Sequence, residues 1–265
     1  MEVCSHSLAK KKSCLSENIT LEYMYYTGKE STEKKSGSGA YLFNPEEQDP
    51  KLYGKFTKAK VFEGDFLTII QVIRDLVETR IVIYHDDLYH GIEIQTHLYP
   101  IPMDDNKGKE IILSVDTTGI NNQAVVVDSA SKILFFDKTL QTHAFFTDAN
   151  GLFTVERFYG YKEGYQLSSW GSDEIQYNYY PVTSAIGIED KKTGNKRITL
   201  MNDRSQGGTS RRIGQVELMI HRVCTTDDKL NLEEVLKDVD PATGAVREVD
   251  LTHYLILSKG NKWLI

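Results

Sequence analysis

The chain has 265 residues, with 31 Lys or Arg against 38 Asp or Glu, so its formal net charge is −7. Hydrophobic residues make up 40% of it and charged residues 26%, which fits a globular protein and excludes disordered, collagen-like and coiled-coil chains. The acidic balance argues against a protein that binds nucleic acid through the phosphate backbone. Three cysteines are too few for a disulfide scaffold.

The sequence predicts neither a membrane span nor an export signal. Its apolar stretches, such as Ile111–Leu113, are far shorter than the ~20 residues that a bilayer-spanning helix needs. The basic run Lys10–Lys12 is followed by the polar segment Ser13–Glu17 rather than by an apolar core, so we expect no signal peptide in this chain and no membrane partner.

Most of the predicted elements are strands, because 15 Tyr and 10 Phe favour extended backbone. In chain order, the predicted strands are Ile19–Tyr26, Ala40–Phe43, Ala59–Phe62, Phe66–Ile73, Arg80–Tyr84, Gly91–Tyr99, Glu110–Asp116, Ala124–Val127, Lys132–Phe136, Phe153–Tyr159, Ser184–Ile188, Arg197–Met201, Gly214–Ile220 and Leu251–Leu257. In Gly91–Tyr99, apolar residues alternate with Glu93, Gln95 and His97, which is typical of a strand with one buried face.

Turn residues separate these strands. Asp104–Gly108, Asp148–Gly151 and Glu189–Asn195 contain Gly and Asn, which tolerate a positive φ. The polar segment Lys29–Gly39 is a predicted loop, and Asn231–Asp238, which precedes a proline, is a predicted helix. Many short strands and few short helices predict a mainly β fold, either a sandwich or a barrel.

The segment from His85 to His90 contains two imidazoles and two carboxylates, groups that bind zinc. The two His residues are five positions apart, however, which places them on neither one helix face nor one strand face. We therefore interpret the segment as a polar hairpin turn and predict no metal site. The sequence also contains no serine nucleophile elbow, phosphate loop or paired CxxC, and spacing alone cannot pair its carboxylates for catalysis.

The most unusual polar segment lies between the predicted strands Arg197–Met201 and Gly214–Ile220. Its residues are Asn202, Asp203, Arg204, Ser205, Gln206, Gly207 and Gly208, followed by Thr209 and Ser210. Polar loops on a rigid sheet often carry binding residues, and paired glycines allow a close approach of the backbone. The alternative is a wide structural turn whose Asp203 and Arg204 bond neighbouring loops.

One triplet, Asn18-Ile19-Thr20, is an N-glycosylation sequon. It makes Asn18 a candidate glycosylation site in a secretory compartment, although a single triplet of this kind is common by chance in a chain of this length.

The segment Asn202–Ser210, followed by Gln215–Arg222, resembles the block NDRSQGGSS…ELM.HRR of family-38 glycoside hydrolases, the α-mannosidases of lysosomal type. Further segments are similar to other blocks of that family in the same order, over about residues 19–257: they are Ser38–Pro45, Tyr99–Pro102, Gly108–Glu110, Asp116–Thr117, Phe145–Gly151 and Asn178–Val182.

This resemblance is to the C-terminal β half of the family only. It implies a large antiparallel β-supersandwich of the galactose-mutarotase-like kind over residues 40–265, incomplete at the C-terminus, preceded by an N-terminal strand and a flexible polar loop in residues 1–39. In the family, zinc and the nucleophilic Asp lie in an N-terminal α/β barrel next to a helical bundle. We therefore expect no catalytic residue, no metal site and no cofactor in this chain, and zinc only in the full-length enzyme.

The resemblance further implies a domain that supports the barrel in an enzyme hydrolysing α-mannosides of glycans. Tyr41 and Arg222 are candidates for the rim of the sugar pocket, and interdomain packing is the alternative role for each. The implied partners are the barrel and bundle, mannose-containing glycans and, through exposed faces, a second copy of the chain. The implied location is lysosomal or secretory. We expect the chain to be inactive alone, and a free-standing carbohydrate-binding β-sandwich is the alternative function.

Three departures from the family pattern bear on these expectations. Val223 stands where the family has a second Arg, and Asp227–Glu233 lacks the usual Arg-Gly. Residues 118–144 form a longer segment than expected, which we predict to contain an added hairpin without an assigned function. The family's greater length on both sides of the match suggests an excised domain, a truncated gene product or one piece of a split enzyme.

Overall fold

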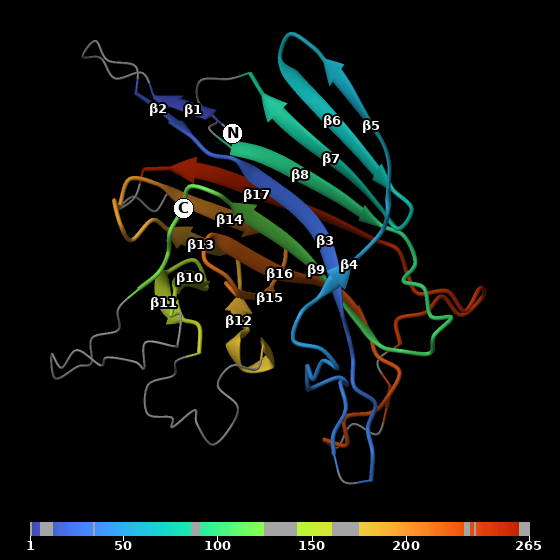
Figure 1. Cartoon of the computed structure of the whole chain (residues 1–265). Coiled ribbons are helices and arrows are strands. Elements are labelled where there is room, and N and C mark those ends of the chain that lie inside the picture. Colours follow the sequence, from blue (N-terminus) through green and yellow to red (C-terminus); the bar gives the residue numbers. More distant parts are fainter. Residues whose placement is uncertain are drawn as a thin grey trace, which may run out of the picture.

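A computed structural model of the chain describes residues 2–5, 13–33, 35–85, 91–124, 142–160, 175–230, 234–235 and 237–259. These residues form two antiparallel sheets that pack face to face, together with a separate hairpin (Figure 1). Among them only Ile175–Asn178 is helical, as a short 3-10 turn. The predicted mainly β sandwich is therefore confirmed.

The larger sheet has nine strands in the order β11-β10-β13-β14-β17-β8-β7-β6-β5, so that β17, from the end of the chain, lies at its centre. In chain order its strands are β5 (Phe56–Glu63), β6 (Leu67–Arg74), β7 (Val77–Tyr84), β8 (Gly91–Leu98), β10 (Ala144–Ala149), β11 (Phe153–Phe158), β13 (Ala185–Glu189), β14 (Arg197–Asn202) and β17 (Val249–Ser258).

The smaller sheet has six strands in the order β12-β15-β16-β9-β3-β4. Its strands are β3 (Ile19–Thr27), β4 (Lys51–Leu52), β9 (Lys109–Thr117), β12 (Tyr180–Val182), β15 (Gln206–Thr209) and β16 (Gln215–Val223). The separate hairpin pairs β1 (Glu2–Ser5) with β2 (Ser13–Ser16). Because β3 lies inside this sheet between β9 and β4, the N-terminal segment contributes to the sandwich; the division at residue 39 stays a prediction.

The core fills the space between the two sheets. β9 is buried over its first seven residues, which matches the continuous apolar run at Ile111–Leu113. The expected alternation in β8 is present, since Ile94, Thr96 and Leu98 are buried while the residues between them are half-buried. Tyr23 of β3 crosses the interior, where its hydroxyl lies 2.7 Å from Thr96 Oγ1. Thus the buried faces of β8 and β9 are directed at the space between the two sheets.

The turns follow the expected residue chemistry. Asn106 and Asn150 have φ of 52° and 53°, and Gly151 and Gly194 have φ of 70° and 61°. These residues lie in the three predicted turns. Gly and Asn occupy left-handed backbone there at little cost, which is why the strands end at these points.

Two predicted elements are wrong. Ala40–Phe43 is a bend rather than a strand, because its amides bond a buried side chain instead of a neighbouring strand. No helix is present at the described part of Asn231–Asp238, where the amides of Lys237 and Val239 instead bond carbonyls two residues earlier.

Some predicted features lie outside the described residues. They are most of the added hairpin, namely residues 125–141, and residues 86–90 of the predicted polar hairpin turn. The described part of the chain contains no helix of the length and hydropathy that crossing a bilayer requires.

Candidate functional site

The two candidate rim residues are connected through what we call the Arg222 cluster, formed by Gly39, Tyr41, Glu110, Arg222 and Asp228. Arg222 and Glu110 are cross-strand partners on β16 and β9. The Nε atom of Arg222 lies 2.6 Å from Oε1 of Glu110, and its Nη2 donates a hydrogen bond of 2.8 Å to the carbonyl oxygen of Gly39. A strand pairing therefore carries an ion pair that also holds the chain just before Tyr41.

Asp228 fixes the other side of this bend. Its carboxylate, which is fully buried, accepts hydrogen bonds from the backbone amides of Tyr41 at 2.5 Å and Leu42 at 3.2 Å. A Cβ on Gly39 would lie 2.5 Å from the amide nitrogen of Asp228, so only glycine fits at that position. The locked bend leaves the side chain of Tyr41 outside, with 64% of its surface exposed.

The electrostatics of the cluster are set by burial. Desolvation raises the pKa of Glu110 to about 7, and the nearby guanidinium of Arg222 limits the rise. Burial likewise raises the pKa of the free thiol of Cys224, which makes that thiol a poor nucleophile. Because Glu110 is buried and Arg222 is engaged in an ion pair and a hydrogen bond, Tyr41 is the member of the cluster whose side chain is most exposed to solvent.

The polar motif Asn202–Gly208 is less open than its sequence suggests. Asp203 and Arg204 form a two-bond ion pair of 2.9 and 3.0 Å. Arg204 also donates to the carbonyl oxygen of Asp250 at 2.7 Å, and Asp203 accepts from the amide of Thr252 at 3.0 Å. Partial burial alone would raise the pKa of Asp203, but these hydrogen bonds hold it below its ordinary value. The Asp203–Arg204 pair thus ties the motif to β17. The side-chain amide of Asn202 donates a hydrogen bond of 3.3 Å to the carbonyl of Val182. Ser205 is exposed.

The second half of the motif is a strand, β15, and not a loop as predicted. A Cβ on Gly208 would lie 2.7 Å from Cγ2 of Val182 and 2.9 Å from Cδ1 of Ile186, so the glycine pair permits close packing against the core. Gln206 lies 3.1 Å from the ring of His253, whose pKa is lowered to about 4 by burial. The sequence leaves open whether Gly207 and Gly208 admit a ligand or serve a wide structural turn. In the structure, the neighbours closest to a Cβ at either glycine are the protein's own side chains.

Sequence reasoning missed one buried acid, Glu217 of β16. Its carboxylate accepts hydrogen bonds from Tyr179 at 3.0 Å, Tyr26 at 3.2 Å and Arg211 at 3.3 Å, and burial raises its pKa. The signal was present, since Glu217 is a charged residue inside an apolar strand pattern. Arg211 is close in the chain, but Tyr179 and Tyr26 come from distant segments, so the full set of neighbours could not be read from the sequence.

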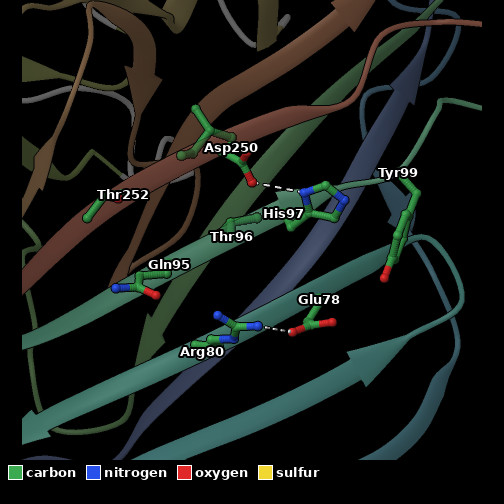
Figure 2. A pocket seen from close by; sticks show the side chains of 9 residues that line it. Glu78, Arg80, Gln95, Thr96, His97, Tyr99, Asp250 and Thr252 are labelled. Carbon is green, nitrogen blue, oxygen red and sulfur yellow. Dashed lines mark hydrogen bonds and ion pairs between the residues drawn. The ribbon is translucent and has the colours of Figure 1, made fainter.

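A second surface feature is a hollow of about 460 Å3 on the outer face of the larger sheet (Figure 2). Its polar and aromatic side chains come from three adjacent strands and the residue after β8: they are Glu78, Arg80, Gln95, His97, Tyr99, Asp250 and Thr252. The sequence marks none of them as a site residue, because strands separated by more than 150 residues must pair before the hollow exists.

The remaining site predictions are that the chain holds no metal and that Asn18 carries a glycan. Within the described ranges, no three His, Cys, Asp or Glu residues come close enough to hold a metal ion, so these residues do not fit a zinc site. Asn18 and Thr20 of the sequon are both exposed at the start of β3. Glycosylation of Asn18 stays a prediction.

Comparison with known proteins shows which family the chain belongs to. Residues 5–230 match the family described as the glycosyl hydrolases family 38 C-terminal domain. The chain belongs to this family. The match includes the Arg222 cluster, the Asn202–Gly208 motif and β16, which confirms the resemblance drawn from the sequence blocks.

Curated relatives of the chain are much longer than it is. The chain is similar to lysosomal α-mannosidases of Felis catus, with 31% identity over 84% of the chain, and of Homo sapiens, with 30% identity over 78%. An α-mannosidase of Canavalia ensiformis is 28% identical over 83% of the chain. These matches cover only 19%, 18% and 20% of the respective relatives. The chain therefore spans about a fifth of the proteins that it resembles.

Proposed function

We propose that this chain is the supporting β domain of an α-mannosidase that hydrolyses α-mannosides in glycans. The observation that carries the proposal is the match of residues 5–230 to the C-terminal domain of family 38, together with relatives named α-mannosidases. The partners in this proposal are a catalytic barrel and a helical bundle that hold the zinc ion and the nucleophile. The lysosomal names of several relatives support a lysosomal location.

Within that enzyme, we assign Tyr41 to the rim of the sugar pocket. Its phenol is exposed on a bend that Asp228 and Gly39 make rigid, and a phenol can pack against a sugar ring or hydrogen-bond to a hydroxyl. Arg222 is assigned a positioning role, because its guanidinium bonds Glu110 and the carbonyl of Gly39, two residues before Tyr41.

The first experiment follows the chain in extracts of the cells that make it. The native chain should co-elute on gel filtration with α-mannosidase activity towards an aryl α-mannoside, while the purified chain with added zinc should show none. Elution of the chain apart from all such activity would overturn the proposal. Turnover by the purified chain would refute its inactivity alone.

A second experiment tests the rim residues in the active assembly. Tyr41→Phe should lower kcat/KM, and Arg222→Lys should do so in part through KM, because the bend that presents Tyr41 is loosened. Phe66→Ala, a change of an exposed aromatic residue outside the cluster, is the control and should leave kcat/KM unchanged. Equal kinetics for all three variants would contradict the assignment of the rim.

A free-standing carbohydrate-binding sandwich is the second candidate function. It predicts that the chain performs its role without a barrel partner, so elution apart from α-mannosidase activity combined with glycan binding would favour it.

A further inference from the structure

The hollow on the outer face of the larger sheet lies apart from the Arg222 cluster. It crosses β7, β8 and β17 at the middle of the nine-stranded sheet, whereas Glu110 and Arg222 lie on β9 and β16 of the other sheet. Its polar side chains point away from the core, since the alternating residues Thr79 and Thr96 bond Tyr23 in the interior. A volume of about 460 Å3 falls within the ~300–1,000 Å3 typical of small-molecule sites.

One end of the hollow is an aromatic wall. The rings of His97 and Tyr99 lie edge to face, with centroids 4.8 Å apart and an angle of 84° between their planes. Both residues are half-buried, so the pair is held in place while a ring surface remains accessible. A wall of this kind can pack against the C–H face of a pyranose ring.

The floor of the hollow is a grid of polar side chains. Gln95 of β8 is the cross-strand partner of Arg80 on β7 and of Thr252 on β17, so the three form one row across the strands. The next row contains Glu78, His97 and Asp250. Figure 2 shows both rows on the same face. Amide, guanidinium and carboxylate groups each offer more than one hydrogen-bonding atom, which suits neighbouring hydroxyls of a sugar.

The charged groups of the hollow already have partners within it. The guanidinium of Arg80 lies 3.2 Å from the carboxylate of Glu78, and Nδ1 of His97 lies 2.9 Å from a carboxylate oxygen of Asp250. An anionic ligand such as a phosphate would have to break the Arg80 pair to gain a cation. A neutral ligand rich in hydroxyl groups has no such cost, since it can bond the paired groups as they stand.

The rim on β17 is held by the family motif. Arg204 donates to the carbonyl of Asp250, and Asp203 accepts from the amide of Thr252. The same sheet face continues beyond Gln95 to Glu93, which accepts from the hydroxyl of Tyr84 at 2.9 Å and pairs across the strands with Tyr254. Aromatic side chains therefore lie at both ends of a polar strip. This strip is longer than a single sugar ring, so it fits a chain of several rings.

We propose that this strip, from Tyr99 through Gln95 to Tyr84, binds a neutral oligosaccharide, with Tyr99 and His97 as the stacking wall and Gln95 and Arg80 as hydroxyl partners. The site would serve glycan binding separately from the proposed pocket rim. It adds a binding function to the domain and does not depend on the assignment of Tyr41 or Arg222.

The test is titration calorimetry of the full chain with three probes, namely α-linked mannotriose, maltotriose and cellotriose. At least one should bind with a Kd of about 1 mM or tighter. Tyr99→Ala and Gln95→Ala should each weaken that binding about tenfold. Phe66→Ala and Gln123→Ala, which change exposed residues of matched type outside the hollow, should leave the Kd unchanged within about twofold.

Several outcomes would overturn the proposal. They are no binding of any probe, equal binding by the hollow variants and the wild type, or loss of binding in Tyr41→Ala alone, which would place the sugar at the Arg222 cluster. If Tyr99→Ala fails to fold, Gln95→Ala and Thr252→Ala decide the question, because both change half-buried or exposed side chains on the outer face. A failure here leaves the proposed enzyme role intact, since that role is measured as co-elution with activity.

Discussion

Glu110, the buried acid of the Arg222 cluster, links the stability of the domain to pH. Its pKa in the folded chain is about 7, above the ordinary 4.5, because burial penalises the charged form. The folded state therefore holds this proton more tightly than the unfolded state. The resulting stabilisation is fully present below pH 4.5 and is lost as the pH rises to about 7; its size is on the order of 3 kcal/mol.

We predict that Glu110→Gln reduces this loss of stability between pH 4.5 and pH 7. The amide keeps the size of the side chain and removes its titration. The measurement is the urea unfolding free energy at several pH values, with Glu63→Gln on the exposed strand β5 as the control. Glu217, whose pKa is also raised, leaves a part of the slope in the variant. If the variant lost as much unfolding free energy between pH 4.5 and pH 7 as the wild type, Glu110 would be ionised in the folded chain over this range.

His253 acts in the opposite direction. Burial lowers its pKa to about 4, below the ordinary 6.5, so the unfolded state gains a proton that the folded state does not. The contribution of the neutral His253 to the free energy of unfolding is fully present above pH 6.5 and is lost as the pH drops towards 4. We predict that His253→Gln, compared with the exposed His85→Gln, makes the domain gain more stability on acidification. Thermal unfolding at pH 7 and pH 5 measures the difference, and equal shifts in the two variants would contradict the buried neutral imidazole.

At the scale of elements, β15 shows how packing can override local propensity. Its sequence, Gln206-Gly207-Gly208-Thr209, has the composition of a loop, yet it pairs with both β12 and β16. Gly208 accounts for this, because the strands and the core around Val182 and Ile186 leave no room for a Cβ. A side chain at this position would force neighbours off their packing positions.

We therefore predict that Gly208→Ala lowers the free energy of unfolding by about 1–3 kcal/mol. Gly64→Ala is the matched control, since a Cβ on Gly64 would meet only the carbonyl of Leu67 at 3.3 Å, and its effect should be within about 0.5 kcal/mol. Chemical denaturation of both variants gives the comparison. Similar losses for both would mean that the strand can shift to admit a methyl group.

The strands that were predictable share one property, which is a local pattern. β8 alternates polar and apolar residues, and β9 carries a continuous apolar run, so each could be found from its own residues. Ala40–Phe43 looks like a strand by composition, but the distant carboxylate of Asp228 takes its amides. What the sequence could not supply at Ala40–Phe43 was this partner far away in the chain.

The candidate sites divide in the same way. Tyr41 and Arg222 were found through sequence blocks, and the structure brings them to one cluster through Gly39. The bond between Glu110 and Arg222, and the row of Gln95 with Thr252, depend on strand register over more than 100 residues. The sequence does not show which distant strands pair or in which register. Spacing along the chain therefore could not predict the hollow.

At the scale of the whole molecule, the larger sheet ends in an exposed strand. Every residue of β5 is exposed, and within the described part of the chain it pairs only with β6 (Figure 1). Phe56, Val61 and Phe62 have 64%, 58% and 51% of their surface in solvent. Lys58 and Lys60 lie between them, and charges of this kind oppose edge-to-edge pairing without covering the apolar area.

This edge predicts that the purified chain associates with itself as its concentration rises. Burying these apolar side chains between two copies gains about 25 cal/mol for each Å2 removed from water, and pairing of two β5 strands would satisfy their free backbone groups. Light scattering coupled to gel filtration should show a mass above that of one chain. The double change Val61→Lys with Phe62→Lys should return the mass to that of a monomer, because it adds like charges on both faces of the strand.

The control is Leu152→Lys, at an exposed turn outside β5, which should leave the self-association unchanged. A monodisperse monomer at all concentrations, or dissociation by Leu152→Lys alone, would show that β5 is not the associating edge.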